Sequence, residues 1–167
     1  LNLLLKRIIG YEKPLRVALL GYLSLKFKTF KPHYESILYE SCLEAKKLGI
    51  NQLSVIELGV AGGAGIISLE KYKKKIEKVL DVNIEIYGFD TGSGLPKIEV
   101  NEDLPFLWKK GLYNIDKESL EKKVKSKIFY GDIKNTVDDF IKINKNNICC
   151  IFFDLDLYTS TINFLNQ

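Results

Sequence analysis

The stretch that decides the fold reads Val55-Ile56-Glu57-Leu58-Gly59-Val60-Ala61-Gly62-Gly63-Ala64-Gly65, where a short apolar run meets an acidic residue and a glycine-dense turn. Valine, isoleucine and leucine are typical of a buried parallel strand. Four glycines within seven residues allow positive φ angles and close approach of a ligand to the backbone. Residues 66–80 then carry apolar side chains at helical spacing, so the turn opens a helix whose first N–H groups favour electron-rich atoms. A strand, a glycine loop and a helix in this order favour a nucleotide-like ligand.

The composition is that of an ordinary globular chain of one-domain size, with 167 residues, 46% hydrophobic and 28% charged. The net charge of +4 comes from scattered lysines and lysines on helix faces, so we expect no nucleic-acid partner. No run reaches the roughly 18 apolar residues of a membrane span, and the amino-terminal segment lacks the apolar core of a secretory signal. Cys42, Cys149 and Cys150 are interpreted as buried thiols in a reducing compartment, so we expect a cytoplasmic protein.

Two domains of unequal kind are expected. Residues 1–33 are leucine-rich but interrupted by basic residues, and are predicted to be a helical extension packed on its own domain. A lid, a contact between copies of a homo-oligomer, and a membrane-surface helix are the alternatives for this segment. Residues 34–167 are predicted to form a partial Rossmann-like domain. The chain starts at Leu1, contains no methionine and stops partway through a predicted helix, so we expect a fragment of a longer protein.

Strands and helices are predicted to alternate from residue 34 onward. Helices are expected at 34–49, 66–80, 116–126 and 135–143 and from about residue 159, and strands at 55–58, 84–90, 128–130 and 148–153. This alternation favours an α/β fold, a parallel sheet with right-handed crossovers and helices on both faces, of which this chain holds four strands. Residues 91–112 have no clean period and are predicted to be a long functional loop with one helical turn at 104–110. Asp116 is predicted to cap the helix that follows it.

Each of the four predicted strands ends in a carboxylate, namely Glu57, Asp90, Asp132 and Asp154. The carboxyl ends of parallel strands line one crevice, where ligands bind. Glu57 and Asp90 lie 33 residues apart, longer than the roughly 20 residues of a dinucleotide-binding fingerprint. An acidic residue ahead of the glycines would repel a pyrophosphate, but it could bind an ammonium group or order the loop. The pattern therefore favours a cationic, nucleoside-containing cofactor over NAD.

Five blocks of this sequence resemble the class I S-adenosylmethionine-dependent methyltransferases, in particular the macrocin O-methyltransferase (TylF-like) family. They span nearly everything from residue 53 onward and read Glu57-Leu-Gly-Val-Ala-Gly-Gly-Ala-Gly65, Tyr87-Gly-Phe-Asp-Thr-Gly-Ser-Gly-Leu-Pro96, Trp108-Lys-Lys-Gly111, Tyr130-Gly-Asp-Ile-Lys-Asn-Thr136 and Phe153-Asp-Leu-Asp-Leu-Tyr-Thr-Ser-Thr161. The resemblance implies that the methionine part of S-adenosylmethionine would be held by Glu57, Gly59, Gly63 and Gly65. By the same resemblance, Asp90 would bind the ribose hydroxyls, and Asp132 with Ile133 would lie beside the adenine. Ordinary turn-forming acids are the alternative interpretation of Asp90 and Asp132.

The same resemblance implies a magnesium site at the last strand end, with Asp154 as the first ligand and Asp156 as the second. Mg²⁺ prefers oxygen ligands and would lower the pKa of a substrate hydroxyl. The alternative is that one of these aspartates caps the helix near Thr159. The family's later strands, with their own acidic residues, are not in this sequence, so full activity is not expected from the chain as given.

The function implied is transfer of a methyl group from S-adenosylmethionine to a hydroxyl of a sugar or other small polar metabolite. Two alternatives stay open. A nucleotide-sugar glycosyltransferase would explain Asp154 and Asp156 but not the glycine loop. A non-catalytic cofactor-binding or scaffolding domain would be favoured if the isolated chain bound neither S-adenosylmethionine nor metal. His33, the only histidine, is expected in the turn that enters the first predicted helix, in a structural or solvent-facing role, with a general base or a metal ligand as the alternatives.

Overall fold

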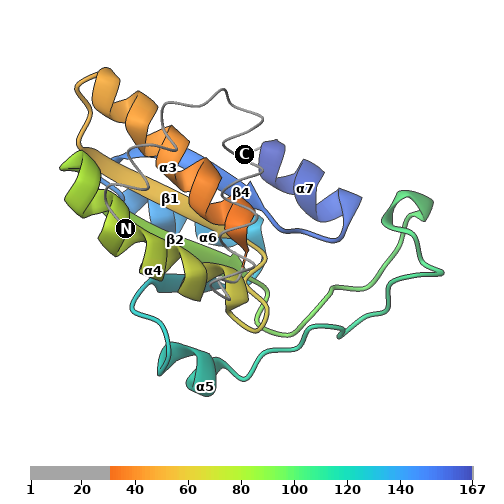
Figure 1. Ribbon diagram of the computed structural model, residues 1–167. Helices are drawn as coiled ribbons and strands as arrows, with labels where there is room; N and C mark the ends of the chain where they lie inside the picture. Colours follow the sequence, from red (N-terminus) through yellow and green to blue (C-terminus); the bar gives the residue numbers. More distant parts are fainter. Residues whose placement is uncertain (1–30, 167) are drawn as a thin grey trace.

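The structure is a computed structural model that describes residues 31–166 (Figure 1). Four parallel strands form one sheet in the order β3-β2-β1-β4: β1 (Gln52–Leu58), β2 (Asn83–Asp90), β3 (Lys127–Tyr130) and β4 (Asn147–Phe153). β1 pairs with β2 on one side and with β4 on the other, so it is the central strand. The carboxyl ends of all four strands therefore meet at one edge of the sheet. The predicted α/β, Rossmann-like architecture is confirmed, while the helical extension predicted for residues 1–33 falls almost wholly outside the described residues.

Helices cover both faces of the sheet. α3 (Pro32–Lys47) and α4 (Ala64–Leu80) pack on one face, and α6 (Ile133–Ile143) and α7 (Tyr158–Leu165) pack on the other (Figure 1). Two short helices, η1 (Asn101–Asp103) and α5 (Lys117–Glu121), lie in the excursion between β2 and β3. Among residues 31–166, no helix has the length and apolarity needed to cross a bilayer.

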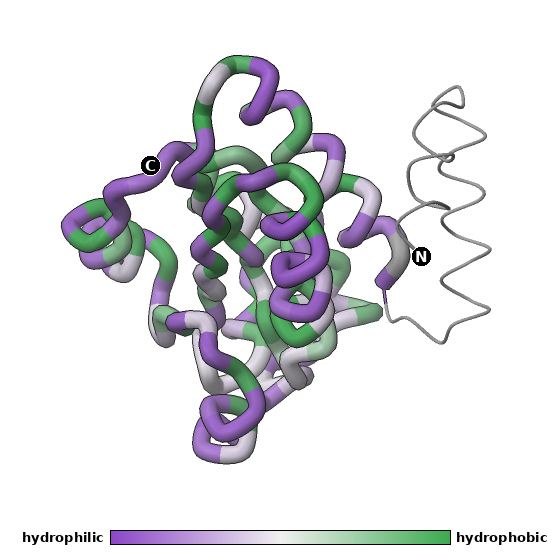
Figure 2. Tube along the Cα trace, turned by 60° about the vertical axis from the view of Figure 1, so that its left-hand side comes forward, coloured by the Kyte–Doolittle hydropathy of each residue, from purple (hydrophilic) through white to green (hydrophobic). Residues whose placement is uncertain are grey.

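The alternation of side chains along β1 divides the core into two layers. Leu53 and Val55 pack in the cluster formed with α3 and α4, whereas Ile56 and Leu58 pack in the cluster formed with α6 and α7. Because side chains of a strand point alternately to the two faces, Glu57 follows Leu53 and Val55 onto the α3/α4 face. Figure 2 shows hydrophobic stretches in the interior, and hydrophobic and hydrophilic residues alternating along the helices.

The largest departure of an element end from the sequence prediction is at α5. The predicted helix at 116–126 ends as α5 at Glu121, because Glu70 accepts the backbone N–H groups of Lys125 and Ser126 at 2.6 and 2.7 Å. A hydrogen-bonded turn lies inside the segment where a helical turn was predicted (104–110), since the Leu104 carbonyl accepts the N–H groups of Leu107 at 2.8 Å and Trp108 at 3.1 Å. The short helix η1 (Asn101–Asp103) precedes this turn. The predicted N-cap is confirmed: the side chain of Asp116 accepts the N–H of Ser119 at 3.1 Å.

Candidate functional site

Two adjoining cavities lie at the carboxyl edge of the sheet. A cavity of about 260 Å³ is bordered by Gly59 and Ala61 of the glycine loop and by Asp154 and Asp156 after β4. A cavity of about 430 Å³ is bordered by Gly131, Asp132 and Ile133 after β3 and by the start of α7. The two cavities share five lining residues, which are Asp90, Thr91, Pro96, Leu155 and Ser160. Ligand sites in proteins commonly occupy about 300–1,000 Å³, so the pair has the capacity for a nucleoside-sized ligand.

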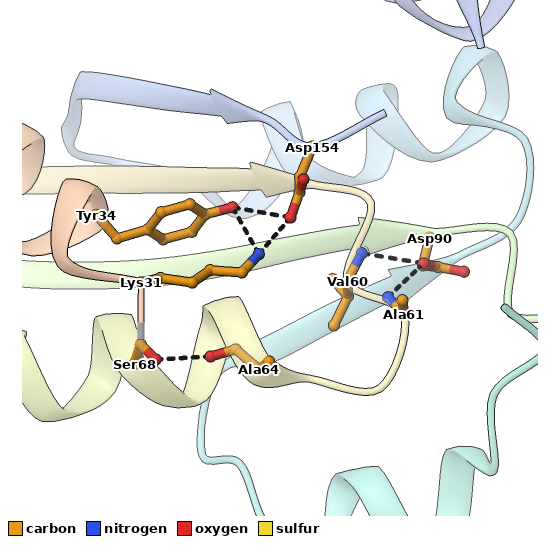
Figure 3. A network of polar contacts seen from close by, with 8 residues as sticks. All are labelled: Lys31, Tyr34, Val60, Ala61, Ala64, Ser68, Asp90 and Asp154. Carbon is orange, nitrogen blue, oxygen red and sulfur yellow. Dashed lines mark hydrogen bonds and ion pairs between the residues drawn. The ribbon is translucent and has the colours of Figure 1, made fainter. Parts of the chain in front are cut away.

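Asp90, at the end of β2, is bonded to the glycine loop. Its Oδ2 accepts the N–H groups of Val60 at 3.0 Å and Ala61 at 2.9 Å (Figure 3). Its Oδ1 accepts the N–H of Gly92 at 2.8 Å. These bonds hold Ala61 at a φ of 44°, a left-handed conformation that an alanine adopts at a cost. A carboxylate offers about four acceptor positions, so Asp90 retains one for a ligand hydroxyl. Asp90 therefore shapes the loop and borders both cavities.

Glu57 lies beneath the glycine loop and does not line either cavity. It is fully buried on the α3/α4 face, and a Cβ atom placed on Gly65 would come within 1.6 Å of its Oε1. Within the described part of the chain, neither carboxylate oxygen has a partner in hydrogen-bonding geometry. Burial raises the pKa of Glu57 to about 7, although the nearby Tyr34 hydroxyl and Lys31 ammonium favour the charged form. Of the two roles foreseen for this acid, its placement favours ordering the loop.

Gly59 and Gly63 have structural reasons to be glycine. Gly59 has a φ of +85°, and a Cβ there would lie 2.3 Å from the carbonyl oxygen of Asp154. Gly63 precedes α4 with a φ of 86°. The close approach at Gly59 brings the ends of β1 and β4 together, which forms the floor of the 260 Å³ cavity.

Asp154 is engaged by two residues that lie more than a hundred positions earlier. Lys31 forms an ion pair with its Oδ2, and the Tyr34 hydroxyl donates to the same oxygen at 3.1 Å (Figure 3). The Tyr34 ring stacks on Phe152 with centroids 4.3 Å apart, which fixes its position. Burial raises the pKa of Tyr34 well above its usual range, and the Glu57 and Asp154 charges add to this, so the phenol stays a proton donor.

The arrangement around Asp154 and Asp156 does not fit the predicted magnesium site. The ammonium of Lys31 lies against Asp154 Oδ2, so a positive charge already neutralises the carboxylate expected to be the first metal ligand. Among residues 31–166 there is no group of three or more histidine, cysteine, aspartate or glutamate side chains placed to hold a metal ion. Asp156 borders the 260 Å³ cavity, and its pKa is raised by burial and by the neighbouring Asp154. We derive no catalytic step through a metal.

Asp132 and Ile133 lie at the start of α6 and border the 430 Å³ cavity, while the adenine contact expected of them stays a prediction. Asp132 is also the N-cap of α6, since its Oδ1 accepts the N–H of Lys134 at 3.0 Å. His33 is exposed in the first turn of α3, with its ring 4.9 Å from that of Tyr34 and edge-on to it. Cys42, Cys149 and Cys150 are free, Cys42 buried and the other two half-buried.

Sequence reasoning missed two residues of the site, Asp103 and Thr159. Asp103 is buried and accepts both the N–H of Thr159 at 2.8 Å and its hydroxyl at 2.7 Å. Capping of the helix near Thr159 by Asp154 or Asp156 was the alternative to a metal site, and the structure instead gives the Thr159 N–H an acceptor from 56 residues earlier. No local pattern marks Asp103, because its partner is brought to it only by the folded sheet.

Known proteins resemble this chain in fold. No protein-family model matches the sequence, and no protein of curated function is similar enough to be matched. The crystal structure of CalS11, a calicheamicin methyltransferase, superposes with a TM-score of 0.59 at 22% identity, over 99% of this chain and 69% of that one. An apo structure of CalS11, described as a TDP-rhamnose 3'-O-methyltransferase of calicheamicin biosynthesis, gives 0.49 at 21% identity over the same shares. The likeness to the first structure shows that the chain has a methyltransferase-like fold.

Proposed function

We propose that this chain binds S-adenosylmethionine and belongs to an O-methyltransferase of the TylF-like kind, acting on a hydroxyl of a sugar or other small polar metabolite. The observation that carries the proposal is the bonding of Asp90 to the glycine loop between two adjoining cavities. The fold shared with a calicheamicin methyltransferase supports methyl transfer. The hydroxyl acceptor rests on the resemblance of the five sequence blocks to the TylF-like family.

The residues present fit S-adenosylmethionine by the chemistry of their side chains. Asp90 retains one acceptor position for a ribose hydroxyl. The 430 Å³ cavity combines the apolar side chains of Ile133 and Val100 with the polar edge of Asp132, which suits a purine ring. Bound there, S-adenosylmethionine would supply an activated methyl group, and this chain would orient it towards the 260 Å³ cavity, where the acceptor would enter. Gly59 lets the floor of that cavity form, and Glu57 would support the glycine loop from below.

Magnesium is left out of the proposed mechanism because Lys31 engages Asp154. The same ion pair weighs against the glycosyltransferase alternative, which needs Asp154 and Asp156 for a metal-bound nucleotide sugar. The non-catalytic alternative makes a different prediction: no hydroxyl compound would be methylated by the complete protein.

Calorimetry with S-adenosylhomocysteine, with and without Mg²⁺, tests the cofactor assignment. We expect binding by the wild type and at least a ten-fold loss in Asp90→Ala, because the loop loses its acceptor and the ligand loses a hydroxyl partner. Asp139→Asn is the matched control, since this carboxylate is exposed and pairs with Lys142 on the surface of α6. No binding by the wild type, or equal binding by Asp90→Ala, would reject the assignment.

A further inference from the structure

The long loop after β2 is fastened to α7 by a buried carboxylate. Asp103 is 2% exposed, and its two oxygens accept the backbone N–H and the hydroxyl of Thr159. Aspartate is seldom buried unless its charge is compensated. The compensation here comes from these two donors and from the amino end of α7, where free N–H groups favour a negative charge. We call these two hydrogen bonds the Asp103–Thr159 joint. They replace hydrogen bonds to water and link the long loop to α7.

A second attachment holds the base of the same loop. Leu95 and Leu112 are joined by a 2.8 Å bond from the Leu95 N–H, and the Gly111 N–H donates to the Leu95 carbonyl at 2.9 Å. Beyond this base, residues 96–103 run along the 430 Å³ cavity, contributing Lys97, Val100 and Asp103 to its lining. They face Asp132 and Ile133 on the β3 side. The loop thus supplies one wall of the cavity, and β3 with α6 supplies another.

Apolar packing does not hold this wall in place. Val100, within the wall, is 37% exposed, and past Asp103 the apolar side chains of Leu104 and Phe106 are 41% and 83% exposed. Side chains so exposed contribute little burial free energy to the attachment. Among the described residues of the loop beyond its base, Asp103 is the buried one that bonds to the body of the domain. The position of the wall accordingly depends on the Asp103–Thr159 joint.

We propose that Asp103 is a positioning residue of the ligand site: by bonding to Thr159 it fixes residues 96–103 as the outer wall of the 430 Å³ cavity and so determines how tightly the nucleoside end of the ligand is enclosed. This inference rests on the proposed function. Asp103 acts through the wall rather than by touching reacting atoms. Thr159 contributes through its hydroxyl and its backbone, and only the hydroxyl can be removed by substitution.

Three substitutions separate the contributions of the Asp103 carboxylate and the Thr159 hydroxyl to ligand affinity. Asp103→Ala removes both acceptors, Thr159→Val removes one donor with little change in volume, and Thr159→Ser keeps the hydroxyl. We expect the affinity for S-adenosylhomocysteine to fall at least ten-fold in Asp103→Ala and several-fold in Thr159→Val, and to stay within two-fold in Thr159→Ser. Trypsin cleavage after Lys97, Lys109 and Lys110 is expected to accelerate in the same order, which a loss of affinity by direct contact would not produce.

Glu70→Ala is the matched control for loss of a bridging carboxylate. Glu70 also accepts bonds from a segment 55 residues away, and it lies among the residues of a different hollow. Its loss is expected to lower stability in urea while leaving the affinity for S-adenosylhomocysteine within two-fold. If Asp103→Ala fails to fold, Thr159→Val and Thr159→Ser decide the matter.

The binding measurements test the role of Asp103 separately from the proposed cofactor binding. A wild type that does not bind S-adenosylhomocysteine removes the proposed function and this inference together. A wild type that binds, with Asp103→Ala and Thr159→Val binding equally well, removes only the role of Asp103. Graded loss of affinity together with graded cleavage of the loop supports it.

Discussion

The carboxylate of Glu57 lies directly against the Cα atom of Gly65, so the strand before the glycine loop and the helix after it touch at a point where no side chain fits. This contact requires glycine at position 65 for packing, whether or not Gly65 also contacts a ligand. It also places a buried acid at the first turn of α4, where N–H groups are free.

Gly65→Ala should therefore destabilise the protein by about 1–3 kcal/mol, the range for inserting a methyl group into a packed site. The new Cβ would lie 1.6 Å from Glu57 Oε1, and a buried acid has little room to move. Urea unfolding at pH 7 measures the change. Gly62→Ala is the control, because nothing lies within 4 Å of its Cβ position and its φ is not positive. Equal midpoints for the two variants would contradict the prediction.

The pH dependence of stability should carry the signature of Glu57. Burial raises its pKa from the ordinary 4.5 to about 7 in the folded protein, so the folded state binds the proton more tightly than the unfolded state. The resulting stability is present in full below about pH 4.5 and is lost as the pH rises through about 7. The loss amounts to about 3 kcal/mol at most.

Glu57→Gln removes this proton and should flatten that part of the profile. We expect the variant to be more stable than the wild type at pH 8 and to approach it at pH 4.5. Urea unfolding of both proteins at several pH values gives the difference between their free energies of unfolding as a function of pH. Titrating groups that the two proteins share cancel in this difference. A difference that does not vary between pH 4.5 and 8 would show that Glu57 is ionised throughout.

The ion pair between Lys31 and Asp154 predicts how a divalent ion would behave. The two side chains are 25% and 50% exposed, so we expect Lys31→Met to change stability by less than about 1 kcal/mol. The Lys31 ammonium repels a dication approaching Asp154, so the same variant should bind Mn²⁺ several-fold more tightly than the wild type in calorimetry. The gain should vanish in Lys31→Met combined with Asp154→Asn. Equal Mn²⁺ affinity of wild type and Lys31→Met would mean that Asp154 is not a ligand.

Local, repeated sequence patterns predicted the strands and the glycine loop. Apolar runs ending in acids located all four strands, and the order of strand, glycine loop and helix predicted the crevice that Asp90 and Asp132 border. The role of Glu57 depends on which face of the sheet its side chain points to. Strand alternation puts it on the face covered by α3 and α4, and the sequence alone does not show which helices cover that face. The contacts of Asp103 with Thr159 and of Lys31 with Asp154 join residues 56 and 123 positions apart. Such pairs have no spacing rule, because the sheet and its crossovers bring them together.

Gly59→Ala tests whether the junction of β1 and β4 controls the ligand site. The Gly59 N–H donates to the Phe89 carbonyl at 2.9 Å, and the Asp154 N–H donates to the Leu58 carbonyl at 2.9 Å, so three strands are tied together at this point. A Cβ at Gly59 would stand 2.3 Å from the Asp154 carbonyl oxygen, with φ at +85°. Since an L-residue is strained at that angle, the end of β4 must move away and the floor of the 260 Å³ cavity must open.

For Gly59→Ala we therefore expect a loss of about 2 kcal/mol in the free energy of unfolding, from overpacking and strain together. The affinity for S-adenosylhomocysteine should also fall, by at least ten-fold, measured by calorimetry at a temperature where the variant is fully folded. Gly65→Ala serves as the comparison, because it strains the same loop from the opposite side of β1, away from the cavity. A smaller loss of affinity in Gly65→Ala than in Gly59→Ala, at similar cost in stability, would locate the ligand over Gly59. The reverse order would place the ligand above the start of α4 instead.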